Sequence, residues 1–192
     1  MQIYLTGYKG RLGKEIINAS TEKIKTLEYN YKDISPYKDL RKLNHKDVII
    51  HAGASLNYNL EKQLFYQNNY KALTSLVNTC RISGTKLIFI SANSIGKYKL
   101  VSDLENFRDY YTLLKYKCEQ YIQKLLPNDQ FYIIRLPGLY SKNEKGHGFL
   151  DKVFYSKNKV FKIEANSKFN NLCLYSAAAK FITKLIYRDR FE

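Results

Sequence analysis

A tyrosine and a lysine with the spacing of a proton-transfer pair occur at Tyr111 and Lys115, in a segment that has the pattern of a helix over 109–126. Residues four apart lie on one face of a helix, and a nearby ammonium lowers the pKa of a phenol because it favours the phenolate. Such a pair can act as a general acid or base near neutral pH. The same spacing recurs at Tyr58/Lys62 and Tyr155/Lys159, so position in the fold must decide between the pairs.

Three glycines at intervals of three residues form a second group. Gly7, Gly10 and Gly13 follow a short apolar segment and precede a stretch with helical periodicity. A strand that turns at such glycines into a helix lets the backbone approach a diphosphate, and the helix N-terminus supplies N–H groups and partial positive charge. We therefore expect this turn, which also contains Lys9, Arg11 and Leu12, to bind a dinucleotide. The alternative is a tight turn that binds no ligand.

Strand-like and helix-like segments alternate as far as residue 136. Apolar runs predict strands at 3–6, 23–29, 47–54, 86–91 and 130–136. Helical patterns follow the glycine turn and recur at 37–43, 60–83 and 109–126. Short strands at 159–163 and 172–174 and a helix at 176–187 are expected near the end.

This alternation predicts an α/β fold with a doubly wound parallel sheet. The continuous apolar run at 47–54 is typical of a strand that is buried on both faces. Ligands of such sheets bind at the carboxyl edge of the strands. Of the three Tyr/Lys pairs, only Tyr111/Lys115 opens the helix that follows the fourth strand, at that edge.

The end of the second strand bears on the choice of cofactor. An acidic residue there usually binds the adenosine ribose of a dinucleotide, and Glu28 is in that place. Lys9 and Arg11 in the turn and Lys32 after the strand could instead hold a 2′-phosphate. This basic set favours NADP(H) over NAD(H).

The chain of 192 residues has 32 Lys and Arg against 17 Asp and Glu, a net charge of +15. This charge attracts anions such as nucleic acids, anionic lipids or phosphorylated small molecules. The basic residues are dispersed and accompany no recognition motif, which disfavours nucleic acid as a partner. Codon bias of an AT-rich genome is an alternative source of the many lysines.

Several kinds of protein are disfavoured by the sequence. No apolar run is long enough to cross a bilayer, and no leader precedes the first strand. The three cysteines and three histidines are too scattered for a disulfide framework or a metal site. We expect a cytoplasmic protein without a metal.

Together, these segments resemble the extended branch of the short-chain dehydrogenase/reductase family, the sugar-nucleotide epimerases, dehydratases and reductases. The matching segments occur in the family's order: Thr6–Gly13, Asp33-Ile34, Asp47–Ala54, Asn69, Leu87–Ser91, Tyr111–Lys115 with Glu119, and Ile133–Tyr140. The resemblance implies a Rossmann-like dinucleotide-binding domain over 1–140. It also implies a reduced substrate-binding segment over 141–192, packed on the same domain.

The resemblance implies an NAD(P)-dependent oxidoreductase or epimerase that acts on a nucleotide-activated or similar anionic sugar, and a homodimer. Tyr111 and Lys115 would be its catalytic pair, and Lys115 would also hold the cofactor ribose. Further cofactor contacts are implied at the adenine (Asp33, Ile34), near the middle of the cofactor (Ala52, Gly53, Ala54) and beside the nicotinamide (Pro137, Gly138, Leu139), and also at His51 and Asn69.

Two features depart from the family pattern. The family usually places a catalytic Ser or Thr directly after the serine that ends the fourth strand, whereas Ala92 follows Ser91 here. We expect Ser91 or Ser94 to substitute. The C-terminal part is also short, which fits a reduced substrate site, a smaller substrate or a partner subunit that completes the cleft. Both departures favour the alternative function, a non-catalytic dinucleotide-binding sensor or scaffold. The segment Ala92–Ser94 also lacks the acidic residues of the dehydratases, which argues against sugar dehydration.

Overall fold

The computed structural model describes residues 1–28, 43–57, 59–97, 110–141 and 172–188. Some predictions concern residues outside these ranges. They include the cofactor contacts at Lys32, Asp33 and Ile34, all but the last residue of the helix predicted at 37–43, the strand at 159–163 and most of the predicted substrate-binding segment.

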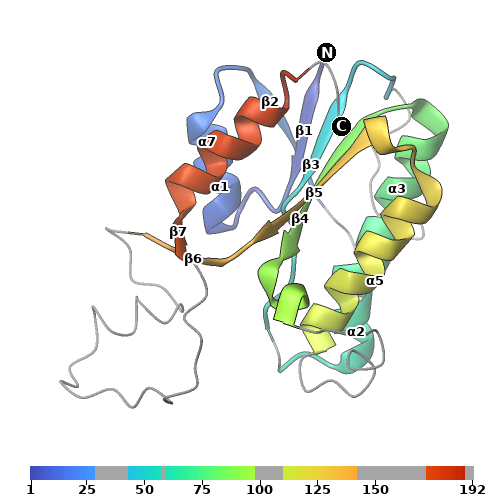
Figure 1. The fold of residues 1–192 in the computed structure, drawn as a ribbon, viewed down its shortest axis with the longest axis vertical. Helices are drawn as coiled ribbons and strands as arrows, with labels where there is room; N and C mark the ends of the chain where they lie inside the picture. Colours follow the sequence, from blue (N-terminus) through green and yellow to red (C-terminus); the bar gives the residue numbers. More distant parts are fainter. Residues whose placement is uncertain (29–42, 58, 98–109, 142–171, 189–192) are drawn as a thin grey trace.

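Five parallel strands form the central sheet, in the order β2-β1-β3-β4-β5 (Figure 1). Their bounds are Ile3–Thr6 (β1), Ile24–Leu27 (β2), Val48–His51 (β3), Lys86–Ala92 (β4) and Phe131–Leu136 (β5). All five predicted strands are present, although β3 ends at His51, before the predicted Ala54. The strand order reverses between β1 and β3, and open α/β sheets bind ligands beyond the carboxyl ends of the strands at such a switch point.

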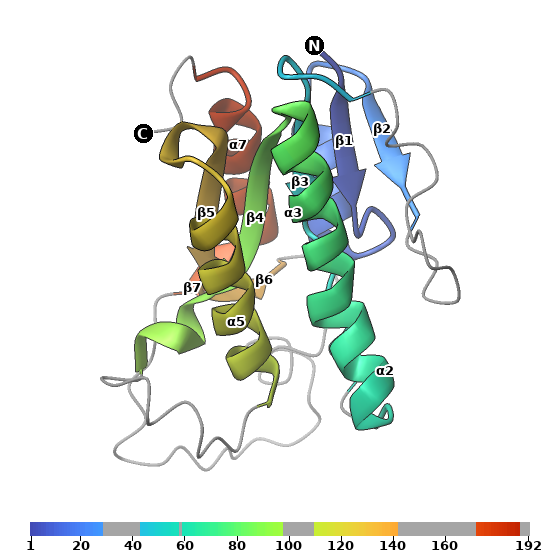
Figure 2. The same ribbon diagram turned by 90° about the vertical axis from the view of Figure 1, so that its right-hand side faces the viewer.

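Helices cover both faces of this sheet, which confirms the doubly wound α/β fold (Figures 1 and 2). Helix α1 (Arg11–Ala19) and helix α7 (Tyr175–Leu185) lie side by side on one face. Helix α3 (Ala72–Ser83) and helix α5 (Tyr110–Leu125) lie on the other.

Alternation along the strands builds a core on each face. In β4, Ile88 and Ile90 pack into the core beneath α1 and α7, whereas Leu87 and Phe89 pack into the core beneath α3 and α5. All four residues of β3 are buried. The apolar runs of the sequence therefore correspond to strands that are covered on both sides.

The helix predicted over 60–83 is interrupted. The structure has α2 (Lys62–Tyr66), a π-helical turn η2 (Gln67–Lys71) and then α3. Asn69 lies in the π-helical turn with 3% of its surface exposed. Its Oδ1 accepts from the N–H of Ser55 at 2.9 Å, and its Nδ2 donates to the carbonyls of Ser55 and Phe65 at 3.2 and 3.0 Å. The turn thus ties this helix to the segment that follows β3.

A second, two-stranded sheet joins β6 (Gly138–Tyr140) to β7 (Leu172–Leu174) in parallel. The sequence predicted β7 but not β6. Because β7 leads directly into α7, the chain returns at Tyr175 to the carboxyl edge of the main sheet. No helix in the described part of the chain has the length and hydropathy needed to span a membrane.

Candidate active site

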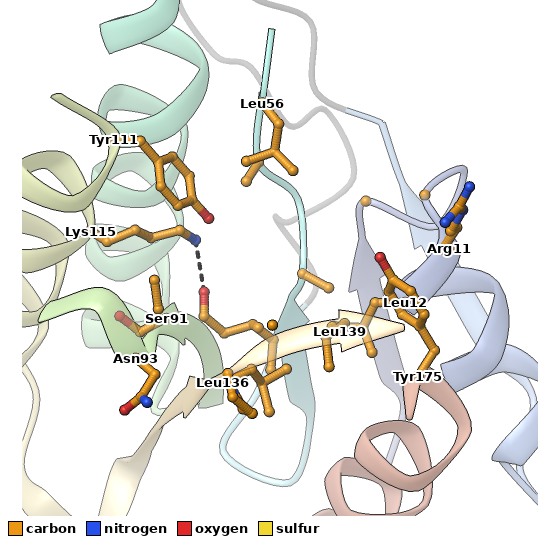
Figure 3. A pocket seen from close by; sticks show the side chains of 18 of the residues that line it. Arg11, Leu12, Leu56, Ser91, Asn93, Tyr111, Lys115, Leu136, Leu139 and Tyr175 are labelled. Carbon is orange, nitrogen blue, oxygen red and sulfur yellow. Dashed lines mark hydrogen bonds between the residues drawn. The ribbon is translucent and has the colours of Figure 1, made fainter. Parts of the chain in front are cut away.

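A cavity of about 650 Å³ opens at the carboxyl edge of the main sheet (Figure 3). Its volume is typical of small-molecule sites, which enclose about 300–1,000 Å³. Most of the residues that the sequence singled out line it: Gly7, Gly10, Arg11, Leu12, Gly13, Ala52, Ala54, Ser91, Ser94, Tyr111, Lys115, Pro137, Gly138 and Leu139. The fold therefore brings the glycine turn and the Tyr/Lys pair to one space.

The glycine turn is built for a close approach of backbone to backbone. Gly7 has a φ of 71°, in the left-handed region that favours glycine. A Cβ on Gly13 would lie 2.3 Å from the carbonyl oxygen of Gly7, so only glycine fits there. Helix α1 begins after Gly10, which provides no side-chain cap, and its first turn holds no acidic residue. This cradle suits a diphosphate group.

Lys115 is buried beneath the cavity, with 3% of its surface exposed. Its Nζ donates to the carbonyl of Ile90 at 2.7 Å and lies 5.7 Å from the centre of the Tyr111 ring. Burial lowers the pKa of Lys115 to about 8. Figure 3 shows the hydroxyl of Tyr111 directed toward the space above the Lys115 ammonium. The two side chains thus lie together at the cavity, and their role in proton transfer stays a prediction.

The two candidate serines differ in what they contact. Ser91 is buried at the end of β4, and its hydroxyl donates to a carboxylate oxygen of Glu119 at 2.5 Å. Ser94 lies in a 3-10 helix, η3 (Asn93–Lys97), with its Oγ 2.7 Å from the Oγ1 of Thr112. The Ser91 proton is directed to Glu119, whereas in the contact between Ser94 and Thr112 either hydroxyl can be the donor. Ser94 can therefore accept from Thr112 and still donate to a ligand.

His51 lies in the core below the site. It is 2% exposed, its Nδ1 is 2.8 Å from the Oγ1 of Thr6, and its ring stacks on Phe89. Burial lowers the pKa of His51 to about 3, and the charge of Lys115 adds to this effect. The imidazole is therefore neutral at physiological pH, which is unsuited to acid catalysis.

Besides Lys9 and Glu28, three of the predicted cofactor residues that the structure describes do not line the main cavity: His51, Gly53 and Asn69. His51 and Gly53 line a smaller cavity of about 240 Å³ beside it, together with Ala54 and Ser55. The side-chain amide of Asn69 is hydrogen-bonded to the backbone of Ser55 and Phe65, and so holds the segment that follows β3 in place. Whether any of the three touches a cofactor stays a prediction.

Two of the residues expected to select between NAD(H) and NADP(H), Glu28 and Lys9, are paired with each other beside the end of β2. Nζ of Lys9 is 2.7 Å from a carboxylate oxygen of Glu28, which also accepts a hydrogen bond from the hydroxyl of Tyr8. These hydrogen bonds lower the pKa of Glu28 and raise that of Lys9. Arg11 lines the main cavity, whereas neither Lys9 nor Glu28 does so.

Sequence reasoning did not identify Leu56, Asn93 or Tyr175 as lining residues of the cavity. Tyr175 is the first residue of α7 and comes from far along the chain. Figure 3 shows it near Leu12 and Leu139, on the side of the cavity opposite Tyr111. The one sequence signal for its place in the cavity is that Tyr175 directly follows the strand predicted at 172–174.

Known proteins with this fold include nucleotide-sugar enzymes. The dTDP-4-dehydrorhamnose reductase of Bacillus anthracis, solved in complex with NADP, superposes with a TM-score of 0.71 at 20% identity, over 98% of this chain and 72% of that one. The orthologous reductase of Clostridium acetobutylicum gives 0.70 at 21% identity, over 97% and 70%. The UDP-N-acetylglucosamine 4-epimerase of Bacillus cereus gives 0.62 at 16%, over 98% and 74%.

At these identities the superpositions establish a shared fold. A search of curated proteins found no significant match. The sequence profile of the RmlD substrate binding domain matches residues 1–167, most of the chain. The chain therefore belongs to the RmlD substrate binding domain family.

Proposed function

We propose that the protein is an NAD(P)-dependent oxidoreductase or epimerase that acts on a nucleotide-activated or similar anionic sugar. The observation that carries this proposal is that one cavity is lined both by the glycine cradle and by Tyr111 and Lys115. Membership of the RmlD family and the shared fold with an NADP-bound reductase support the same cofactor and substrate class.

The residues present fit a bound dinucleotide. Gly7, Gly10 and the first turn of α1 would hold its diphosphate, and Pro137–Leu139 would lie beside the nicotinamide. When bound, the cofactor supplies or accepts the hydride. Arg11 lines the cavity, and its positive charge favours the 2′-phosphate of NADP(H).

Tyr111 exchanges a proton with the substrate oxygen in this proposal. One proton of the Lys115 ammonium is committed to Ile90, and two remain for the cofactor ribose and for the electrostatic support of the phenolate. The buried setting strengthens that support, because water does not screen the charge.

Ser94 takes the place of the hydroxyl that Ala92 lacks. It lines the cavity on η3, and its partner Thr112 directly follows Tyr111 in α5. The Ser94 hydroxyl can therefore orient a substrate oxygen close to the phenol. Ser91 has the structural role of joining β4 to Glu119.

The test compares Tyr111→Phe and Ser94→Ala with Tyr116→Phe, a control on the same helix outside the cavity. With a panel of nucleotide-linked keto-sugars, we expect Tyr111→Phe to lower kcat by about 10²–10⁴-fold, the usual contribution of general acid–base catalysis. The Kd for NADPH is expected to stay unchanged. Ser94→Ala should lower kcat less, and Tyr116→Phe should have no effect.

An active Tyr111→Phe enzyme would refute the proposed mechanism. The alternative, a dinucleotide-binding sensor or scaffold, predicts that the wild-type protein binds NADPH but transfers no hydride to any sugar of the panel. Ala92 is the observation in its favour. A homodimer and a cytoplasmic location remain predictions.

A further inference from the structure

A buried carboxylate lies one helical turn beyond Lys115. Glu119 is 2% exposed and accepts from three groups. The Ser91 hydroxyl donates to its Oε1 at 2.5 Å, and the Arg135 guanidinium donates through Nε at 3.0 Å to Oε1 and through Nη2 at 2.6 Å to Oε2. A buried charge with this many partners is costly to disrupt, and the proposed function gives it no role.

The contacts of Glu119 join three elements at the site. Lys115 and Glu119, one turn apart on α5, bond to Ile90 and Ser91, which are adjacent in β4. Ser91 is in turn the register partner of Arg135 in β5. Helix α5 is thereby fixed to the ends of both strands, so the helix turn that carries Lys115 cannot slide along β4 without breaking the Glu119 contacts.

The charges that face Lys115 come from several elements. Tyr111 and Cys118 neighbour it on α5, His51 faces it from β3, and Arg135 lies beyond Glu119 on β5. Burial raises the pKa of Cys118 to about 12 and lowers that of His51 to about 3, so both are neutral at pH 7. Cys118 and Glu119 both oppose the effect of burial on the pKa of Lys115. Because the Cys118 thiol is neutral at pH 7, Glu119 is the one of the two that carries a negative charge there.

We propose that Glu119, held by Arg135 and Ser91, is a positioning residue that fixes Lys115 against the end of β4 and keeps its ammonium charged beside Tyr111. This inference rests on the proposed function for its catalytic meaning. Its physical content, the coupling of Glu119 to Lys115, exists in the protein without cofactor or substrate.

The test uses two variants that change the charge near Lys115 in opposite senses. Glu119→Gln keeps the shape and acceptor oxygen but removes the negative charge, so Lys115 should lose its proton at lower pH. Arg135→Gln leaves the Glu119 charge unneutralised, so Lys115 should keep its proton to higher pH. Glu22→Gln, an exposed change outside the site, is the control.

The first measurement is the titration of Lys115 in the cofactor-free protein, followed by NMR of ¹³C-labelled lysine and assigned with Lys115→Met. We expect the acid dissociation constant of Lys115 to rise about three- to tenfold in Glu119→Gln and to fall by a similar factor in Arg135→Gln. The second measurement is the alkaline limb of kcat against pH, which should move to lower pH in Glu119→Gln and to higher pH in Arg135→Gln.

A merely structural role predicts lower unfolding temperatures in both variants with no change in the Lys115 titration, and that result would overturn the inference. Shifts of the same sign in both variants would also overturn it. If Glu119→Gln does not fold, the upward shift in Arg135→Gln, whose side chain is partly exposed, still decides the question. The NMR readout needs no turnover, so an active Tyr111→Phe enzyme would refute the proposed function separately.

Discussion

His51 shows how a single buried side chain links the site to the stability of the protein. It lies under the cavity, paired with Thr6 and stacked on Phe89, and burial lowers its pKa to about 3. In the unfolded chain a histidine titrates near 6.5. Between these two pKa values the unfolded state binds a proton that the folded state does not.

We therefore predict that acid destabilises the protein through His51. Because its folded pKa is lowered, the folded state is favoured fully above pH 6.5 and loses stability as the pH falls toward 3. The loss approaches about 1.4 kcal/mol per pH unit in that window. Urea unfolding at pH 7.0, 6.0 and 5.0 measures it.

The comparison variants are His51→Asn and His45→Gln. His51→Asn is expected to be less stable at pH 7 but to have a shallower dependence on pH, whereas His45→Gln, at an exposed position, should keep the wild-type slope. Equal slopes in all three proteins would contradict the prediction.

At the scale of residues, the sequence predicted which residues line the cavity where local spacing sets the geometry. Gly7, Gly10 and Gly13 and the pair Tyr111/Lys115 each lie within one turn or one helix, and all line the same cavity. The choice between Ser91 and Ser94 could not be made in this way. It depends on Glu119, whose side chain reaches Ser91 from another element.

At the scale of elements, the glycine turn combines two tasks that can be separated by substitution. Gly13 packs against the carbonyl of Gly7, where a Cβ would lie 2.3 Å from its oxygen. Gly10 has more room, since a Cβ there would lie 3.2 Å from the same oxygen. Both glycines line the cavity, and Gly13 in addition serves the packing of α1.

We predict that Gly13→Ala lowers the free energy of unfolding by about 1–3 kcal/mol, the usual cost of overpacking. Gly10→Ala should cost under about 1 kcal/mol and instead weaken NADPH binding about tenfold, a change of about 1.4 kcal/mol. Urea unfolding and fluorescence titration with NADPH measure the two effects. Equal losses of stability in the two variants would show that the turn does not divide its tasks in this way.

The pattern of apolar residues predicted most of the helices and strands, and the exceptions have physical causes. The π-helical turn at Gln67–Lys71 is set by the bonds of Asn69 to the Ser55 and Phe65 backbones, which helical periodicity does not encode. Strand β6 has three residues and exists because β7, far along the chain, pairs with it. Contacts between distant segments are the part that local patterns cannot predict.

At the scale of the whole molecule, the net charge of +15 has a kinetic consequence if the substrate is anionic. A positive field raises the rate at which an anion reaches the site, and salt screens that field. We predict that kcat/KM for a nucleotide sugar falls severalfold between 50 and 500 mM NaCl while kcat stays constant.

Steady-state kinetics over this range of salt, with sucrose of equal osmolality as the control, measures the effect. A kcat/KM that does not depend on salt would show that the charge serves another purpose. Duplex DNA, added as a competitor, tests the nucleic-acid alternative. In that case the affinity of the protein for DNA is high at low salt and falls steeply as the salt concentration rises.

Helix α7 completes the core on one face of the sheet. There Ala179 and Ile182 pack with residues of β1 and α1, namely Ile3, Leu5 and Ile16. Segments from far apart in the sequence are thus buried together. During translation, the N-terminal strand and helix must wait, with apolar faces uncovered, until α7 emerges from the ribosome. Native closure of this core is consequently a late event, and nascent chains stalled before residue 175 should depend on chaperones to stay unaggregated.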